Sequence, residues 1–414
     1  MKKLLSLTVA ALTVTSAFAG GYRVSLQGQK QLAMGHTGVA VVNSAESLFF
    51  NPAAASFLKD RFNFSAGANG LFARTKFQNE TNNWKASTDN FGTPFEVYAS
   101  YRATDWLTVG LAVYSPYGSA VEWEQDWQGA NLVNNIDLQA IYVQPTISIK
   151  VNDYFSVGGG PIYVTGGVTL NKNLSRSLTD EMGNPSDVSI EAKNVSAWGY
   201  TAGFLVNPAK NVRVGVNYRS RITMEARDGD ATFNDIPAFA QGIYSNTKFD
   251  ADLPLPAELT AGLSVELTDK WLVAFDFNHA YWNVYKSLTV DFANGIPTSV
   301  NPRNYKDAST YRFGAQFKPS QKVALRAGWY WDESPVQDGY FAPETPRNDS
   351  MGFTGGLTFQ VTPKFGIDAS FLYLHFNETN NSYNYADEDG TPYSFGGTYK
   401  NVVFSPGVGV TYSF

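Results

Sequence analysis

The 414-residue chain carries a formal net charge of −6 at pH 7 and contains no cysteine. The acidic balance excludes a basic nucleic-acid-binding surface, and the missing cysteines exclude disulfides, thiolate metal sites and a cysteine nucleophile. Charged residues make up only 16% of the chain, whereas aromatic residues reach 15% and glycine occurs 36 times. This composition is typical of an exported β-protein with a lipid-facing surface, although a secreted β-sandwich or β-propeller shares part of it.

The first nineteen residues have the pattern of a secretory signal peptide. Lys2 and Lys3 precede an apolar run over residues 4–18, and cleavage is expected before Gly20. A membrane anchor is the alternative, but the run is shorter than the about 20 apolar residues that a transmembrane helix needs. The sequence therefore predicts a signal peptide over residues 1–19 and an exported mature chain.

A short helix is predicted within LFFNPAAASFL, residues 48–58. The Asn51 side chain can accept a hydrogen bond from the first helical turn, and Pro52 fits that turn because its missing N–H needs no partner there. The alanines that begin at Ala53 pack closely without demanding volume. Because so short a helix is marginal on its own, it needs other elements around it. The alternative is a linker that happens to be helical.

From Phe62 onward the chain alternates with a period of two residues, which is typical of β-strands. In VRVGVNYRSR, residues 212–221, the valines share one face, while Arg213, Arg219 and Arg221 lie on the opposite face. The same division into an apolar and a polar face recurs in WLTVGLAVY and KVALRAGWYW. Beyond the signal peptide, no apolar stretch is long enough for a transmembrane helix.

The connections between the strands alternate between short and long. Tight turns recur at residues 104–105, 152–153, 207–210, 268–270, 319–321 and 362–364, and long polar loops lie between them, for example 79–90, 227–254 and 377–397. Short turns on one rim and long loops on the other are typical of a transmembrane β-barrel, and the count predicts fourteen antiparallel strands. Trp106 and Trp271 each begin a strand just after a turn, which predicts an interfacial aromatic girdle; ordinary strand propensity is the alternative.

The segment Ser115-Pro116-Tyr117-Gly118 interrupts the third strand. Pro116 cannot donate to a β-ladder and Gly118 permits a bend, so strand pairing is expected to fail locally. In a closed barrel such a failure makes a gap in the wall. The alternative is that these four residues end the strand and open the next loop.

Apolar side chains within two of the loops are candidates for docking a hydrophobic ligand. They are Trp123, Trp127, Leu132, Phe233 and Phe239. Exposed aromatic residues on such loops predict a weak first docking patch. Packing against the mouth of the barrel is the alternative.

Three arginines are candidate cations for an anionic ligand group. Strand alternation places Arg219, Arg312 and Arg326 on the polar face, which in a barrel is the lumen. Arg312 and Arg326 lie on strands joined by one turn, so they are expected to share one anion. The alternative is that the inward arginines pair with inward acids such as Asp276 and Asp368.

The three histidines do not support an enzyme. His36 precedes the strands, while His279 and His375 lie in phase with apolar neighbours and therefore face lipid. A serine–histidine hydrolase needs a nucleophile, a base and an orienting group within reach of one another. No metal-ligand spacing and no phosphate-binding glycine loop occurs either. The sequence predicts no catalytic residue, no metal and no cofactor.

Several stretches, in their order and spacing, carry a family resemblance. They are the N-terminal segment from GGYRVSLQGQKQLAMGHTG to the Asn51-Pro52-Ala53 motif, then YSPYGSAVEW (114–123), LPLPAELTAGL (253–263), AYWNVY (280–285), LRAGWYWDESPVQ (325–337) and the terminal Phe414. The mature chain resembles the FadL, OmpP1 and TodX family of outer-membrane transporters of long-chain fatty acids and other hydrophobic compounds. The resemblance implies an all-β fold: a fourteen-stranded barrel over residues 61–414, plugged by a small helical hatch over residues 20–60.

The resemblance also implies roles for particular residues. Those expected to shape or gate the hatch are Gly28, Gly35, Gly38, Asn51, Pro52 and Ala53. The SPYG segment is implied to be the kinked third strand through which substrate leaves sideways. Ser115 and Gly118 match the family's kink positions, whereas Pro116 departs from them.

The expected function is uptake of long-chain fatty acids or similar hydrophobic molecules across the bacterial outer membrane. The alternatives are a transporter of aromatic hydrocarbons and a non-specific porin. The expected partners are the substrate, outer-membrane lipid and lipopolysaccharide, and the barrel-assembly machinery acting on Phe414. A monomer without nucleic-acid partners is expected.

Overall fold

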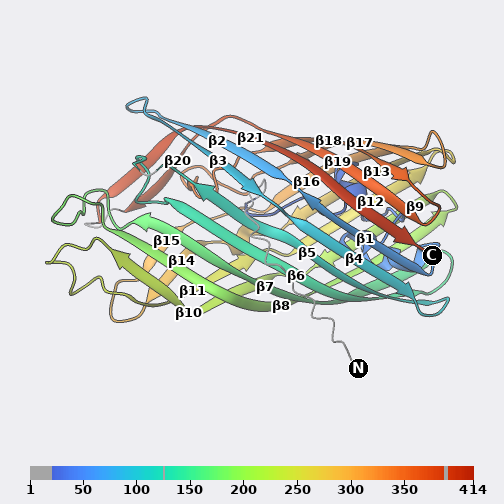
Figure 1. The fold of residues 1–414 in the computed structure, drawn as a ribbon, viewed down its shortest axis with the longest axis horizontal. Helices are drawn as coiled ribbons and strands as arrows, with labels where there is room; N and C mark the ends of the chain where they lie inside the picture. Colours follow the sequence, from blue (N-terminus) through green and yellow to red (C-terminus); the bar gives the residue numbers. More distant parts are fainter. Residues whose placement is uncertain (1–20, 125, 387–389) are drawn as a thin grey trace, which may run out of the picture.

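The computed structural model describes residues 21–124, 126–386 and 390–414, and the predicted signal peptide lies outside these ranges. The described chain folds into one antiparallel β-sheet that closes around a short N-terminal segment (Figure 1). No helix in the described ranges is long and apolar enough to cross a membrane.

Within the described residues, twenty-one strand segments build the sheet. They are β1 (Phe62–Asn69), β2 (Leu71–Asn79), β3 (Lys85–Gly92), β4 (Phe95–Arg102), β5 (Leu107–Glu122), β6 (Asn135–Lys150), β7 (Phe155–Asn173), β8 (Asp187–Ala209), β9 (Val212–Arg219), β10 (Ile222–Asn234), β11 (Thr247–Leu255), β12 (Glu258–Glu266), β13 (Trp271–Ala280), β14 (Ser287–Phe292), β15 (Ser299–Pro302), β16 (Ala308–Phe317), β17 (Val323–Asp332), β18 (Ser350–Gln360), β19 (Phe365–Phe376), β20 (Thr379–Ala386) and β21 (Pro392–Ser413).

Some consecutive segments share one neighbouring strand and therefore form one barrel strand. For example, β1 and β2 both pair with β21, and β9 and β10 both pair with β8. When such segments are merged, fourteen antiparallel strands remain, and the predicted number of strands is confirmed. The barrel closes where β1 pairs with β21, from Asn63 opposite Ser413 to Asn69 opposite Gly407. At this seam the backbone N–H of Phe414 donates to the Phe62 carbonyl at 3.0 Å.

The connections gather by length at the two ends of the barrel. Five of the six tight turns lie where the sequence predicts them, whereas the turn expected at residues 207–210 lies later, because β8 continues to Ala209 and β9 begins at Val212. The turns share one end of the barrel with the C-terminus, which Figure 1 shows at the right. The expected long loops are largely strand instead. Within residues 227–254, for example, β10 continues to Asn234 and β11 begins at Thr247. These hairpin arms extend the barrel because their residues keep the alternation of the strands below them.

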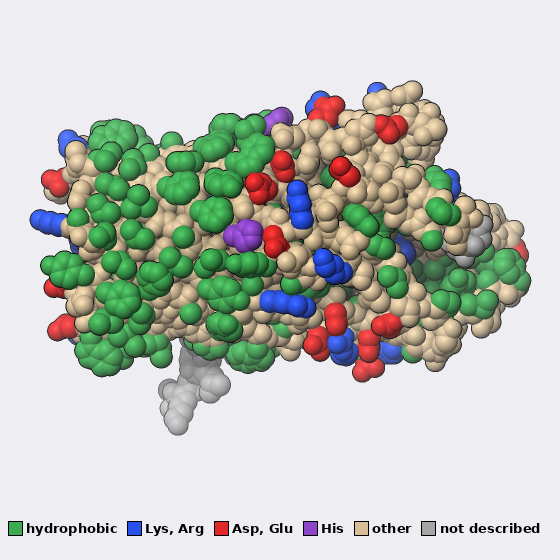
Figure 2. All heavy atoms as spheres, turned by 180° about the vertical axis from the view of Figure 1, so that it is seen from behind, with side chains coloured by type: hydrophobic (Ala, Val, Ile, Leu, Met, Phe, Trp, Pro, Cys, Tyr) green, Lys and Arg blue, Asp and Glu red, His purple; other side chains and the backbone are tan. Residues whose placement is uncertain are grey.

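The outer surface carries a hydrophobic belt over the half of the barrel that bears the turns (Figure 2). Trp106 and Trp271 are exposed at its turn-side edge, where the sequence predicts a girdle. The predicted lipid-facing phase of KVALRAGWYW is confirmed, because Leu325 and Ala327 are exposed while Arg326 is buried.

The lumen has two different linings. In β9 the inward residues are polar, including Asn217 and Arg219, whereas in β10 they are Ile222, Met224 and Ala226. A break between β9 and β10 shifts the phase by one residue. The expected inward position of Arg221 is therefore wrong, and its side chain is exposed. The polar lining lies in the half of the barrel that bears the tight turns, which we call the turn half. The apolar lining lies in the opposite half, which bears the long connections and which we call the loop half.

The N-terminal segment (residues 21–58) fills the polar half. It contains α1 (Gln29–Leu32), α2 (Ser47–Phe50) and η1 (Pro52–Phe57), and most of its side chains are buried. The helix expected after Asn51 is the 3₁₀ helix η1, in which the Asn51 Oδ1 accepts from the Ala53 N–H at 3.1 Å and Pro52 occupies the first turn. The wall holds this helix in place, because Ser156 Oγ donates to the Ala53 carbonyl at 2.9 Å.

Candidate functional site

Strand β5 contains a bulge at the SPYG segment. Opposite β6, Tyr114 pairs with Tyr142 and Tyr117 pairs with Ala140, so β5 carries one extra residue between them. On the other side, pairing with β4 ends at Tyr114. Beyond it the described chain shows no ladder between β5 and β3. The predicted failure of strand pairing is therefore present on the side of β5 that faces β3 and β4. The alternative that SPYG ends the strand is wrong, because β5 continues to Glu122.

The bulge turns β5 into the lumen. Residues 107–113 alternate between buried and more exposed positions, as the wall of a barrel does, whereas residues 114–121 are all buried. A strand that stays in a barrel wall exposes every second side chain. This part of β5 has therefore left the outer surface.

The N-terminal segment binds the backbone groups that the bulge frees. The N–H of Val24 donates to the Pro116 carbonyl at 2.7 Å, and the N–H of Gly118 donates to the Tyr22 carbonyl at 2.9 Å. The Gln27 Nε2 donates to the Ser115 carbonyl at 3.0 Å. Unpaired buried backbone groups are costly, so these bonds stabilise the inward position of β5.

Arg23 connects this region to the far wall. Its guanidinium donates to Asn278 Oδ1 at 2.6 Å and to Thr310 Oγ1 at 2.9 Å, and it forms an ion pair with Asp332 at 3.0 Å. Glu258 lies 3.5 Å from it and accepts a 2.7 Å hydrogen bond from the Tyr117 hydroxyl. We call these residues the Arg23 cluster. Sequence reasoning missed Arg23, because a cation outside the strands has no alternation to reveal its direction.

The three candidate arginines are buried in the lumen but are not brought together. Gln316 faces Arg326 across the β16–β17 ladder, and Arg312 faces Tyr330. The two arginines are thus offset by four residues, about 13 Å at the strand rise of about 3.3 Å. The expectation that Arg312 and Arg326 share one anion is therefore wrong.

Each arginine has a different environment. Arg219 donates to the Phe49 carbonyl at 3.0 Å, and Arg326 donates to Gln316 at 2.9 Å and to Thr358 at 2.7 Å. Arg312 is 4% exposed, and its guanidinium makes no hydrogen bond or ion pair within the described part of the chain.

The inward acids bind the N-terminal segment instead. Asp276 accepts from the backbone of Gly38 at 2.7 Å, and Asp368 lies 4.0 Å from Lys30. The N-terminal segment also carries His36, whose pKa is lowered well below its usual value by burial and by the nearby guanidinium groups of Arg312, Arg23 and Arg219. Its imidazole is therefore neutral among these cations.

Two of the candidate hatch glycines permit close packing. Gly35 has a φ of +67°, and a Cβ there would lie 2.4 Å from the carbonyl oxygen of Phe313 in the wall. A Cβ at Gly38 would lie 2.3 Å from the Phe50 ring. Both positions exclude a larger side chain for steric reasons. A gating role for these residues and for Gly28 remains a prediction.

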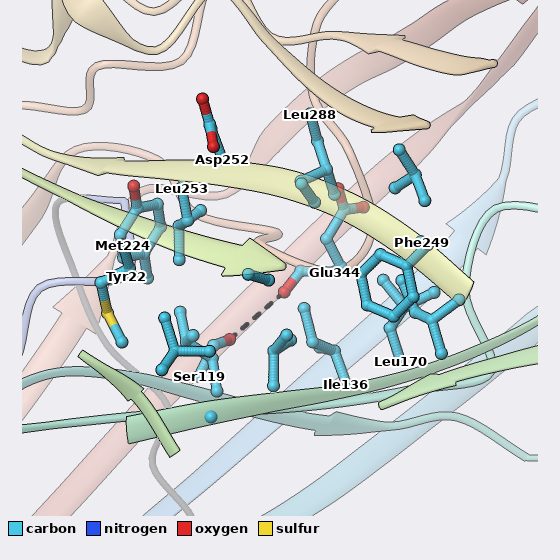
Figure 3. A pocket seen from close by; sticks show the side chains of 18 of the residues that line it. Tyr22, Ser119, Ile136, Leu170, Met224, Phe249, Asp252, Leu253, Leu288 and Glu344 are labelled. Atoms are coloured by element: carbon cyan, nitrogen blue, oxygen red, sulfur yellow. Dashed lines mark hydrogen bonds between the residues drawn. The ribbon is translucent and has the colours of Figure 1, made fainter. Parts of the chain in front are cut away.

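An apolar cavity lies in the loop half of the lumen, beside the bulge (Figure 3). Its walls come from β5–β8, β10, β11 and β14, and include Leu138, Leu170, Ile190, Met224, Phe249 and Leu288. Tyr22 and Ser119 line it, and Ser119 Oγ donates to the Glu344 carbonyl at 3.5 Å. Glu344 and Thr345 belong to the β17–β18 connection, which folds into the lumen. The sequence did contain a signal for this cavity, since the inward phase of these strands becomes apolar in the loop half.

Lys172 lies on β7, two residues beyond the cavity-lining Leu170. On β7 it continues the inward phase of Val168 and Leu170, which both line the cavity. The described residues offer its ammonium group no hydrogen bond or ion pair, and its electrostatic neighbours are Glu344 and Arg303. Because Glu344 forms an ion pair with Arg303, Lys172 is left without a dedicated counter-charge. Sequence reasoning did not select Lys172.

The loop residues expected to dock ligand are mostly buried. Trp123 and Trp127 are 4% and 2% exposed, and their rings stack at 4.4 Å. Phe233 is also buried, Leu132 packs partly against the same aromatic cluster as the two tryptophans, and only Phe239 is fully accessible at 81%. The expected exposed patch is therefore wrong at Trp123, Trp127 and Phe233. The alternative is correct for both tryptophans, because the β5–β6 loop folds back onto the barrel mouth.

The fold defines a membrane β-barrel whose lumen contains an apolar cavity. Residues 10–414 match the family model described as outer membrane protein transport protein (OMPP1/FadL/TodX), and the chain belongs to this family. The protein is therefore a transporter of hydrophobic compounds in the bacterial outer membrane, and not an enzyme. Within the described ranges, no group of three or more His, Asp or Glu residues could hold a metal ion.

Relatives match most or all of the chain. An outer membrane protein of Neisseria meningitidis serogroup B is 27% identical over 100% of this chain and 99% of its own. The long-chain fatty acid transport protein of Escherichia coli O6:H1 is 23% identical over 90% of this chain and 91% of its own.

Solved structures support the fold. A Pseudomonas aeruginosa FadL homologue matches with a TM-score of 0.85 at 18% identity, covering 95% of this chain and 100% of its own. The Pseudomonas putida toluene transporter TodX matches with a TM-score of 0.71 at 17% identity, covering 96% of this chain and 99% of its own.

Proposed function

We propose that the protein takes up long-chain fatty acids or similar amphipathic molecules. The observation that carries this proposal is the apolar cavity, together with the Lys172 ammonium on β7, two residues beyond the cavity-lining Leu170. The apolar walls match the chemistry of an alkyl chain, and a lysine ammonium can bind a carboxylate. The match to a relative named for long-chain fatty acid transport supports the same substrate.

The energetics of binding favour such a molecule. Each buried methylene contributes about 0.8 kcal/mol, so a dozen contribute on the order of 10 kcal/mol before the cost of ordering the chain. A carboxylate buried without a partner would cancel much of this gain. Lys172 would pair with the carboxylate and so remove this cost. It can do so without breaking an existing ion pair, because it has no acid partner of its own.

The proposed path runs from the extracellular loops into the cavity and then sideways through the wall. Phe239 is the accessible apolar residue among the docking candidates. The absence of a described ladder between β3 and β5 supports a lateral exit at Ser115, Pro116, Tyr117 and Gly118. The N-terminal segment makes hydrogen bonds to the backbone of these four residues, so release of substrate there requires this segment to rearrange.

A transporter of aromatic hydrocarbons is the second candidate. The walls of the cavity are almost wholly apolar, and one structurally similar protein is named a toluene transporter. A neutral hydrocarbon would have no use for Lys172. The two candidates therefore differ in their dependence on this one charge.

The test compares oleate with its neutral analogue methyl oleate on the purified protein. Lys172→Gln should weaken oleate binding by about 10- to 150-fold, since a hydrogen bond to a charged group contributes about 1.5–3 kcal/mol. Binding of methyl oleate should not change, and Lys172→Arg should retain oleate. A deletion strain complemented with the Lys172→Gln variant should grow poorly on oleate as carbon source.

The outcomes separate the candidates. Equal binding of oleate by wild type and Lys172→Gln would show that the headgroup lies elsewhere. Tight binding of toluene, with neither oleate nor methyl oleate bound, would replace the fatty-acid proposal with the aromatic one. Mass spectrometry of the ligand that co-purifies in mild detergent gives an independent answer.

A further inference from the structure

Three basic residues lie on the outer wall on the loop side of the hydrophobic belt. The ladders of β9, β12, β13 and β16 align Arg219, Glu258, Ala280 and Ala308 in one row around the barrel. Arg221 lies two residues beyond Arg219, and Lys306 lies two residues before Ala308, so both are on the loop side of these aligned positions. Lys286 comes after Ala280 in the chain and is also on the loop side. All three side chains are exposed. We call them the outer basic row.

An aromatic border lies directly below this row. Tyr200 and Tyr218 face outward with their rings 6.0 Å apart, and His279 and Tyr281 continue the border with rings at 4.8 Å. Tyrosines of outer-membrane barrels mark the level where lipid tails give way to headgroups. The outer basic row therefore sits at headgroup height in the extracellular leaflet. Figure 2 shows basic side chains beyond the edge of the belt on the face that it displays.

The outer basic row lacks acid partners, in contrast to other exposed cations. Lys193 pairs with Glu191 at 2.8 Å and Lys400 pairs with Glu378 at 2.7 Å. Within the described ranges, the side chains of Arg221, Lys286 and Lys306 make no hydrogen bond or ion pair.

The acids near the row are engaged elsewhere. Arg221 and Lys286 line one outer groove together with Asp250, Asp252 and Asp291. These acids contact Asp228 N–H at 3.0 Å, Arg227 at 2.7 Å and Thr298 Oγ1 at 2.7 Å, respectively.

The acids beside Lys306 are engaged in the same way. Asp307 accepts from the Asn283 N–H at 3.0 Å, and Glu333 accepts from the Ser309 N–H at 3.0 Å. The positive charge of the row is thus available to a ligand from outside the protein.

We propose that the outer basic row binds the phosphate groups of lipid A in the outer leaflet. Guanidinium and ammonium groups are the side chains that bind phosphate in proteins, and phosphates are the anions present at this height of an outer membrane. The row spans β9 to β16, three strand spacings or about 14 Å, which suits a headgroup with more than one phosphate. This site is separate from the lumen, so it does not depend on the transported substrate.

The experiment measures lipid binding to the full-length mature protein in zwitterionic detergent by native mass spectrometry. The probes are bisphosphorylated lipid A, the same lipid after removal of its phosphates, and inorganic phosphate. The triple variant Arg221→Gln, Lys286→Gln, Lys306→Gln should bind bisphosphorylated lipid A about tenfold more weakly or worse than wild type. The wild-type affinity should also fall with added salt, since exposed charges are screened.

The matched control is Lys193→Gln, Lys248→Gln, Lys400→Gln, which removes three exposed cations that have acid partners. It should bind lipid A as the wild type does. Unchanged thermal unfolding of both triple variants would show that the barrel is intact. Equal loss in both variants would overturn the proposal, as would equal binding of the dephosphorylated lipid. Displacement of lipid A by millimolar inorganic phosphate would assign the site to a free anion instead.

Discussion

Replacing Arg23 by methionine removes the cation that joins the N-terminal segment to the barrel wall. Asp332 and Glu258 then remain buried without their partner, at 3.0 and 3.5 Å in the native structure. Breaking a buried ion pair by deleting one member costs about 3–5 kcal/mol. If this cost is relieved when the segment leaves the wall, the displaced state becomes roughly 10²- to 10⁴-fold more populated.

Single-channel conductance in planar bilayers measures that population directly. We expect Arg23→Met to open far more often than the wild type, and the N-terminal segment to become accessible to protease. A rescue variant adds Glu258→Gln and Asp332→Asn. Replacing a whole buried ion-pair network by neutral groups is often close to neutral, so the rescue variant should close again.

The control is Arg74→Met, which breaks the exposed pair with Asp89 and should leave the conductance unchanged. If Arg23→Met conducts and resists protease as the wild type does, the Arg23 cluster does not hold the segment in place. If the rescue variant is as open as Arg23→Met, the unpaired buried carboxylates are not the cause of the opening.

Two further predictions concern the N-terminal segment. Gly35→Ala combines a positive φ with a Cβ 2.4 Å from the Phe313 carbonyl, so it should destabilise the segment by about 1–3 kcal/mol in denaturant titrations monitored by proteolysis. The control Gly183→Ala, with a φ of +89° and open space around the glycine, should cost less stability. Equal costs for the two variants would refute the steric argument. Deleting residues 21–58 should make the barrel leaky and abolish ordered uptake of hydrophobic substrate, whereas conductance unchanged from the wild type would indicate a non-specific porin.

The order of the amino acids alone predicts the barrel, because the evidence for it is local. Alternation sets which side chains face lipid, and turn residues set where each strand ends, so fourteen strands follow without knowledge of distant contacts. The bend at Pro116 and the 3₁₀ helix after Asn51 are also local effects, since each depends on a missing N–H or a nearby capping oxygen.

The contents of the lumen depend on tertiary structure instead. Arg221 turns outward because a one-residue break shifts the phase of its strand, and a slip of one residue reverses every side chain that follows. Arg312 and Arg326 lie apart because the register between their strands sets their height. Arg23 reaches Asp332 across 309 residues of sequence, and the apolar cavity forms only between strands that closure of the barrel brings together. Such contacts form between segments far apart in the chain, so their position follows from the closed sheet and not from any local pattern.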